Sequence, residues 1–273
     1  MPWTSAVFSG SASLTDSNTV ARFQSGIGPP ESLRQRSLRC SRMATRGGQQ
    51  RIPRPPSARP GRPAPWAHLT QAQRVFTLTD VRAACDTLPP PVRRAAPPSA
   101  RPAAVLVPFF EANGEARLIL TKRPETMPSH RGEIAFPGGK LEAEHDASLR
   151  DAALREAWEE IGLEPAAVEV VAELERITTV ASRFVLTPFV GLLAEPPALR
   201  PDPTEVVRVF DVSLSELLDD AVFREERWDV PPDLGVTPGL DRPIHFFELA
   251  DETVWGATAR ILAGFLAHLT AQR

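Results

Sequence analysis

Two short apolar runs near the middle of the chain predict a β-hairpin. Ala103–Phe110 and Ala116–Thr121 are rich in branched and aromatic residues and have the length of buried strands. The connection between them, Glu111–Gly114, contains an Asn-Gly pair, which is a strong hairpin signal. We therefore expect two adjacent antiparallel strands here.

A helical pattern follows the hairpin and ends at Gly162. Ser148 with Asp151 has the sequence of a capping box, and Asp146 is the alternative cap one turn earlier. Gly162 suits the left-handed residue that ends many helices. The apolar positions, which form a stripe that must pack on a sheet, are Leu149, Ala153, Ala157 and Ile161.

The remaining apolar patterns complete an α/β chain. Before the hairpin, Thr79-Asp80 is expected to cap a short helix that the prolines from Pro89 must end. Strands on both sides of a central helix, with a second helix at the end, predict an α/β sandwich. The expected strands and helices after Gly162 are strands Val168–Leu174, Phe184–Leu193, Glu205–Val212 and Arg242–Leu249, a short helix from Ser213, and a closing helix Thr253–Leu269.

Charge and composition differ between the N-terminal segment and the rest of the 273 residues. Residues 1–66 hold ten Arg against two acids, whereas the rest is acidic, so the net charge of -3 describes neither part. Residues 1–65 are Arg-, Pro- and Ser-rich without hydrophobic periodicity, which predicts a disordered extension. The alternatives are an organelle transit peptide, a nucleic-acid-binding arm, or an untranslated stretch with Met43 as the start. We expect residues 66–102 to be a short helix and Pro-rich linker, and residues 103–273 to be the functional domain.

Two classes of protein are excluded by composition. Cys40 and Cys85 offer no disulfide framework or cysteine metal cluster, and no apolar run approaches a membrane span of about 20 residues. The arginine-rich run 51–62 has no aromatic residue on which a base would stack, so we expect no nucleic-acid partner. We expect a cytoplasmic protein, or an organellar one if the N-terminal segment is a transit peptide.

The candidate chemistry lies on the central helix and the turn before it. At helical spacing, Glu156, Glu159 and Glu160 share one face, where like charges repel. Several carboxylate oxygens are what a hard divalent cation requires, and the preceding Gly138-Gly139 lets the backbone approach a metal or phosphate. The alternative interpretation is a solvated acidic helix face.

At these residues the chain resembles the Nudix hydrolase family. The resemblance rests on Gly138-Gly139 and on the run from Arg155 to Leu163, which reads Arg-Glu-x-x-Glu-Glu-x-Gly-Leu. Counting back from Arg155, Ala147 and Leu141 occupy the positions of the family's first glutamate and glycine. The longer loop, with Asp146-x-Ser148, resembles the coenzyme A pyrophosphatase subgroup. The resemblance implies a Nudix-type α/β/α sandwich with a mixed sheet and the box on a loop-helix-loop.

The resemblance also implies roles for individual residues. Mg²⁺ or Mn²⁺ would be bound by Glu156, Glu159, Glu160 and the Gly139 carbonyl, and Arg155 would orient the box by pairing with an acid. Glu205, in a segment similar to the subgroup's Pro-x-Glu-Val, is the candidate general base or a further ligand, alongside Glu159; a solvated strand-edge acid is the alternative. The expected substrate-binding residues are Arg123, His130, Arg131, Gly138 and Gly139. For His130 and Arg131 the alternative is that they are ordinary loop residues.

The implied reaction is hydrolysis of the pyrophosphate bond of coenzyme A to 3′,5′-ADP and phosphopantetheine. Three blocks resemble the subgroup: Leu118–Lys140, Leu186–Leu192 and Val254–Arg260. The alternatives are a pyrophosphatase for ADP-ribose or NADH and a nucleotide-binding module without catalysis. The sequence leaves the oligomeric state open.

Overall fold

The computed structural model describes residues 52–92, 100–127, 130–179, 184–229 and 241–273. All of them belong to the compact unit Met43–Arg273. Most of the extension expected over residues 1–65 therefore lies outside the described residues, as does Met43. Within the described ranges, no helix is long and apolar enough to span a membrane.

A mixed sheet of eight strands forms the centre of the described chain. Its main order is β4-β3-β2-β8-β6, with β5 paired to β2, β7 to β8 and β9 to β3. Only the β2–β8 pair is parallel among these pairs. The strands are β2 (Arg101–Ala112), β3 (Glu115–Lys122), β4 (Ile134–Ala135), β5 (Gly138–Lys140), β6 (Val168–Glu173), β7 (Ile177–Thr178), β8 (Phe184–Leu193) and β9 (Arg208–Ser213).

The predicted hairpin is confirmed. Its turn is made by Asn113 and Gly114, which have φ of 57° and 75°. These positive values are the conformation that a two-residue hairpin turn requires.

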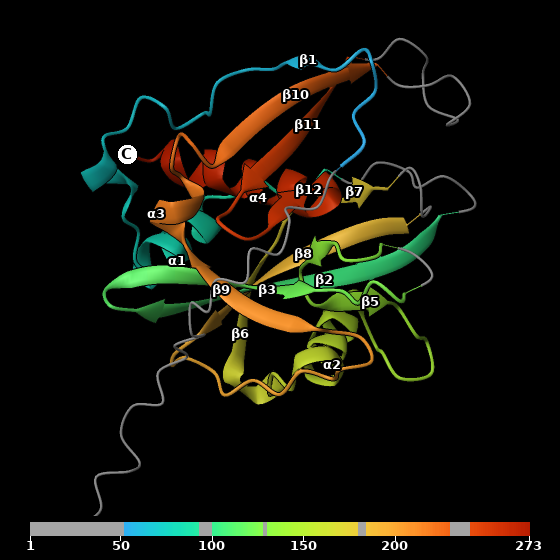
Figure 1. The fold of residues 1–273 in the computed structure, drawn as a ribbon. Helices are drawn as coiled ribbons and strands as arrows, with labels where there is room; N and C mark the ends of the chain where they lie inside the picture. Colours follow the sequence, from blue (N-terminus) through green and yellow to red (C-terminus); the bar gives the residue numbers. More distant parts are fainter. Residues whose placement is uncertain (1–51, 93–99, 128–129, 180–183, 230–240) are drawn as a thin grey trace, which may run out of the picture. The chain divides into compact units, whose positions relative to one another are not determined.

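Helix α2 (Leu149–Ile161) covers one face of this sheet, as Figure 1 shows. Ser148 caps the helix by accepting a hydrogen bond from the Asp151 N–H, and Gly162 ends it at a φ of 66°. The predicted stripe packs as expected: Ala153, Ala157 and Ile161 are buried against strand residues such as Leu106. This packing fixes the acidic face of α2 beside the edge of the sheet.

The opposite face is covered by α1 (Leu78–Asp86) and α4 (Gly256–Thr270), visible in Figure 1. These helices share a larger core with the sheet, in which Phe109 and Phe265 lie 5.5 Å apart between ring centroids. Beyond α4 lies a second sheet, in the order β1-β10-β11-β12. Its strands are β1 (Arg59–Pro60), β10 (Phe223–Asp229), β11 (Asp241–Glu248) and β12 (Thr253–Trp255).

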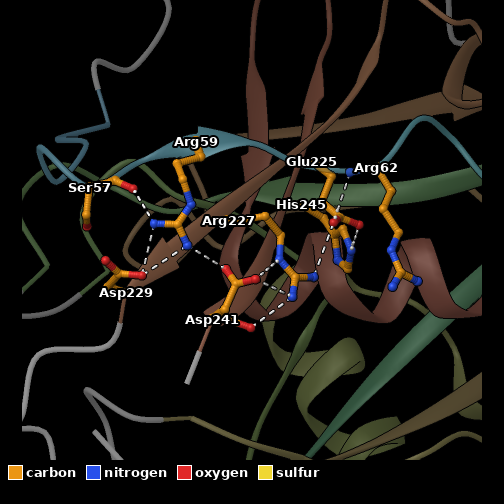
Figure 2. Close-up of polar contacts among 8 residues, drawn as sticks. All are labelled: Ser57, Arg59, Arg62, Glu225, Arg227, Asp229, Asp241 and His245. Atoms are coloured by element: carbon orange, nitrogen blue, oxygen red, sulfur yellow. Dashed lines mark hydrogen bonds and ion pairs between the residues drawn. The ribbon is translucent and has the colours of Figure 1, made fainter. Parts of the chain in front are cut away.

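The structure corrects the predicted start of the folded domain. Residues 59–60, expected to be part of the disordered extension, pair with β10. Arg59 donates hydrogen bonds to Asp229 and Asp241 at 3.1 Å, which Figure 2 shows. Trp66, expected in a linker, is fully buried and its ring centroid lies 4.9 Å from that of Phe223. The segment from residue 52 onward is therefore part of the domain.

Three predicted boundaries also change. Thr77, rather than Thr79, caps α1, because its side chain and that of Asp80 bond each other's backbone N–H. The closing helix begins at Gly256 instead of Thr253, because residues 253–255 pair with β11 and Gly256 turns the chain at a φ of 65°. The strand predicted from Glu205 begins only at Arg208. Three short elements complete the described fold. They are helix α3 (Leu214–Leu217), capped by Ser213 as predicted, and the 3-10 helices η1 (Gln71–Arg74) and η2 (Pro165–Ala167).

The burial of Trp66 leads to a stability prediction. We expect Trp66→Ala to lower the free energy of unfolding by about 3–5 kcal/mol, because it leaves a cavity among aromatic rings. The matched control is Trp158→Ala, since Trp158 is 49% exposed on α2 and its loss should cost below about 1 kcal/mol. Urea unfolding followed by circular dichroism measures both, and equal losses in the two variants would contradict the corrected boundary.

Candidate active site

Gly138 and Gly139, for which the sequence suggested a turn, lie in strand β5, which runs directly against the backbone of β2 and the side chains of α2. A Cβ on Gly138 would lie 2.3 Å from the Ala104 carbonyl oxygen, and Gly138 has a φ of 151°. A Cβ on Gly139 would lie 2.4 Å from the carboxylate carbon of Glu156. The two glycines therefore allow a contact between β5 and the acidic face of α2 that any larger residue would prevent.

Glu160 is the most deeply buried carboxylate of this face. It is 3% exposed, and its Oε2 accepts a hydrogen bond from the Gly138 N–H at 3.1 Å. Arg123, at the end of β3, places its guanidinium 3.6 Å from the other carboxylate oxygen. Burial raises the pKa of Glu160 to about 8, and the charges of Glu156 and Glu205 act in the same direction, whereas Gly138 and Arg123 oppose them. A cation beside Glu160 would offset the free-energy cost of burying the ionised carboxylate.

Glu156 lies next to Glu160 in the same half-enclosed environment. Burial raises the pKa of Glu156 above its usual value, and the charges of Glu159 and Glu205 add to this effect. The neighbouring Arg155 opposes it through an ion pair at 3.0 Å. The carboxylates of Glu156 and Glu160, both with raised pKa values, thus lie beside the two glycines of β5.

Arg155 connects the loop to the helix. Its Nε donates to Asp146 at 2.9 Å, and its Nη1 donates to Glu159 at 2.6 Å. The carboxylate of Asp146 also accepts a hydrogen bond from the Glu142 N–H, and the Arg155 guanidinium holds the pKa of Asp146 below its ordinary value. Asp146 is therefore the partner of Arg155 and Ser148 is the helix cap, which resolves the two capping alternatives.

Glu159 and Glu205 lie at the solvent side of the site. Glu159 is 54% exposed at its side chain and turned toward Arg155. Glu205 is exposed in a turn in which its N–H donates to the Asp202 carbonyl at 3.1 Å, so it lies before β9 and not in the strand that the sequence predicted. The turn forms because Asp202 accepts hydrogen bonds from the N–H and hydroxyl of Thr204. Glu205 nonetheless lies near enough for its charge to act on both buried glutamates.

The loop between β3 and β4 provides the other expected substrate-binding residues. His130, at a φ of 56°, pairs with Glu133 at 2.8 Å, and this hydrogen bond raises the pKa of its imidazole. Arg131 donates to the Met127 carbonyl at 2.8 Å. Arg123, at the start of this loop, approaches the acidic face, because its guanidinium lies 3.6 Å from Glu160.

The donor set fits a hard divalent cation. Carboxylate and backbone carbonyl oxygens are the ligands that Mg²⁺ and Mn²⁺ take in proteins. Among the described residues, no three His, Cys, Asp or Glu side chains converge into a preformed metal site. The Glu156 carboxylate lies against Gly139, in the space that a Cβ on this residue would fill. The residues present therefore suit such an ion, with an open geometry.

Comparison with known proteins shows the family of the chain. A model of the NUDIX domain matches residues 100–233. An uncharacterized Nudix hydrolase NudL from Photorhabdus laumondii is 35% identical over 176 residues, which cover 64% of this chain and 88% of that protein. The chain belongs to the Nudix hydrolase family.

A plant relative and a solved structure extend the comparison. The chain is 42% identical over 167 residues to "Nudix hydrolase 22, chloroplastic" of Arabidopsis thaliana, and the match covers 59% of this chain and 52% of that protein. The chain thus spans about half the length of this Nudix relative. A MutT/nudix family protein from Enterococcus faecalis has 16% identity and a TM-score of 0.41, covering 69% of this chain and 67% of its own.

Sequence reasoning missed part of the arrangement around the Nudix box. Asp146 was matched to the family pattern, but its role as the acid that Arg155 pairs with was left open; its position nine residues before Arg155 was the available signal. Lys122 and Glu252, which form an ion pair beside Arg123, were not singled out, because nothing in their local sequence connects them.

The raised pKa of Glu160 leads to a prediction about metal-free protein. Because its folded pKa lies above the unfolded value, the protonated group stabilises the fold fully below about pH 4.5, and this stabilisation is lost as pH rises through about 8. We therefore expect Glu160→Gln to raise the free energy of unfolding at pH 8.5 in EDTA by about 1 kcal/mol or more.

Glu159→Gln is the matched control for that experiment. Its side chain is 54% exposed, so its stability should change by less than about 0.5 kcal/mol. Denaturant unfolding at pH 5.0 and 8.5 measures both variants. A Glu160→Gln variant that is less stable than the wild type at pH 8.5 would show that the ionised Glu160 carboxylate does not destabilise the folded, metal-free protein.

Proposed function

We propose that this Nudix protein hydrolyses the pyrophosphate bond of coenzyme A or its derivatives, giving 3′,5′-ADP and (acyl-)4′-phosphopantetheine. The observation that supports hydrolase activity is the pair of enclosed carboxylates, Glu156 and Glu160, which lie against Gly138 and Gly139 of β5. Pyrophosphate oxygens are anionic, so such an acidic site accepts them only together with cations.

The proposed ligands are Glu156, Glu159, Glu160 and the Gly139 carbonyl. A bound Mg²⁺ or Mn²⁺ supplies charge neutralisation of phosphate oxygens and a lower pKa for bound water. Glu159 reaches this set by leaving Arg155, which its 54% exposed side chain is free to do. Arg155 keeps its bonds to Asp146 and Glu156, and thereby holds the loop and the helix in position.

The chain's other residues bind and orient the reacting groups. Arg123 lies beside Glu160 and presents a guanidinium suited to phosphate oxygens. His130 and Arg131 are proposed to meet a phosphate from the loop after β3. Glu205, and alternatively Glu159, takes the proton as water adds to one phosphorus and the bridging oxygen leaves with the other phosphate. Both carboxylates lie at the solvent side, where water enters.

The choice of coenzyme A rests on the sequence blocks that resemble its pyrophosphatases. One of these blocks contributes residues to the site, since Leu118–Lys140 supplies Arg123, Gly138 and Gly139. The block Leu186–Leu192 lies in β8, the parallel partner of β2. The alternative substrates are ADP-ribose and NADH, and the alternative function is nucleotide binding without cleavage. The proposed compartment is the cytoplasm, with an organelle as the alternative.

The direct test separates the four substrates. Purified protein with Mg²⁺ or Mn²⁺ is incubated with coenzyme A, 3′-dephospho-coenzyme A, ADP-ribose and NADH, and products are followed by chromatography. We expect release of 3′,5′-ADP from coenzyme A with the highest kcat/KM of the four. Glu160→Gln should lower this value by about 100-fold or more, because it removes a proposed metal ligand.

Glu144→Gln is the control, because Glu144 is an exposed residue of the same loop-helix segment. It should leave kcat/KM within about twofold, as surface substitutions do. Faster cleavage of ADP-ribose or NADH would replace the substrate and keep the reaction. Absence of cleavage for all four, with nucleotide binding retained, would favour the binding module.

A further inference from the structure

Glu252 is a buried carboxylate just before β12, outside the Nudix box. It is 6% exposed, and both of its oxygens accept hydrogen bonds from Lys122 Nζ at 3.0 Å. Arg208 Nη1 donates to the same carboxylate at 3.2 Å. A buried carboxylate is costly unless it is paired, and here two cations pair with it.

The two cations would repel each other without Glu252. Lys122 and Arg208 are direct cross-strand partners in the β3–β9 register, and Val207, the residue before Arg208, donates its N–H to the Lys122 carbonyl at 3.0 Å. Like charges directly opposite each other destabilise a strand pair. Arg208 also pairs with Asp251 at 3.6 Å, but the Asp251 side chain is 56% exposed. Glu252 is the buried acid that Lys122 and Arg208 share, so the joining of the two strand ends depends chiefly on its negative charge.

The same strand ends carry residues of the proposed site. Arg123 follows Lys122, its N–H donates to the Glu133 carbonyl at 3.1 Å, and its guanidinium lies 3.6 Å from Glu160. Glu205 precedes Arg208 by three residues, in the turn that leads into β9. A change in the separation of the strand ends would move Arg123 and Glu205 relative to the α2 carboxylates.

We propose that Glu252 is a positioning residue for the hydrolysis, holding Arg123 and Glu205 in alignment with Glu160 through Lys122 and Arg208. This inference rests on the proposed function. The Glu252 carboxylate contacts Lys122 and Arg208, and its proposed effect on the site is exerted through these two residues.

The test compares two carboxylates that join the same strands. Glu252→Gln is isosteric and removes the charge at the site end of β3 and β9. Asp211→Asn is the matched control, since Asp211 pairs with Arg117 between the same two strands, away from Lys122. We expect kcat with coenzyme A and Mg²⁺ to fall about tenfold or more in Glu252→Gln, with a smaller change in KM, because misalignment of reacting groups is costly. Asp211→Asn should keep kcat within about twofold.

A second substitution distinguishes positioning from a general loss of structure. In Glu252→Gln/Lys122→Met one of the two repelling cations is also removed, so we expect kcat to recover about threefold or more relative to Glu252→Gln. Assays run well below the measured thermal midpoint of each variant. An equal loss in Asp211→Asn, or no recovery in the double variant, would indicate a structural role only and overturn the inference.

The outcomes separate the inference from the function on which it rests. Wild-type protein that cleaves coenzyme A, together with Glu252→Gln at wild-type kcat, overturns the positioning role and leaves the hydrolase intact. Wild-type protein that cleaves none of the four substrates overturns the proposed function, and the positioning role with it.

Discussion

The site depends first on the Arg155 guanidinium. One cation connects the buried Asp146 of the loop with Glu156 and Glu159 of α2, and a further bond at 3.3 Å reaches the Lys140 carbonyl at the end of β5. Three carboxylates on one helix face repel one another, so α2 would be a poor helix without this neutralisation. Asp146 secures Arg155 from the other side, because its side chain is 1% exposed and cannot remain charged there unpaired. The lengthened loop and the acidic helix are thus mutually dependent.

The sequence predicted the sheet well where side chains follow a simple apolar pattern. The strands β2, β3, β8 and β11 and helix α2 have the predicted positions within a few residues. Strand β10 was missed because Arg224, Glu226 and Arg227 make it appear polar; in the fold these charges are paired with neighbouring strands and with Arg54 of the N-terminal segment. The fold boundary was misplaced for the same reason. Arg54 and Arg59 read as part of a disordered basic tail, although their ion pairs hold them to β10 and β11.

The candidate site, too, was predictable from the sequence only in part. Residues adjacent in the sequence were predictable, since helical spacing alone places Glu156 and Glu160 on one face and Gly138-Gly139 precedes them. Contacts between distant segments were not, because no local pattern reports that Arg123 approaches Glu160 or that Glu252 joins Lys122 and Arg208. Pairing of His130 with Glu133 likewise depends on the path of the loop after β3. The acidic face was thus predictable, and its surroundings required the structure.

We propose that the carboxylates of α2 form a site for divalent cations. Titration of metal-free protein with Mn²⁺, followed by electron paramagnetic resonance of the free ion, measures this without any substrate. We expect saturable binding by the wild type, weakened about tenfold or more in Glu156→Gln and in Glu160→Gln. Glu144→Gln should bind as the wild type does. Equal Mn²⁺ affinity in all four proteins would show that the acidic face of α2 is not the metal site.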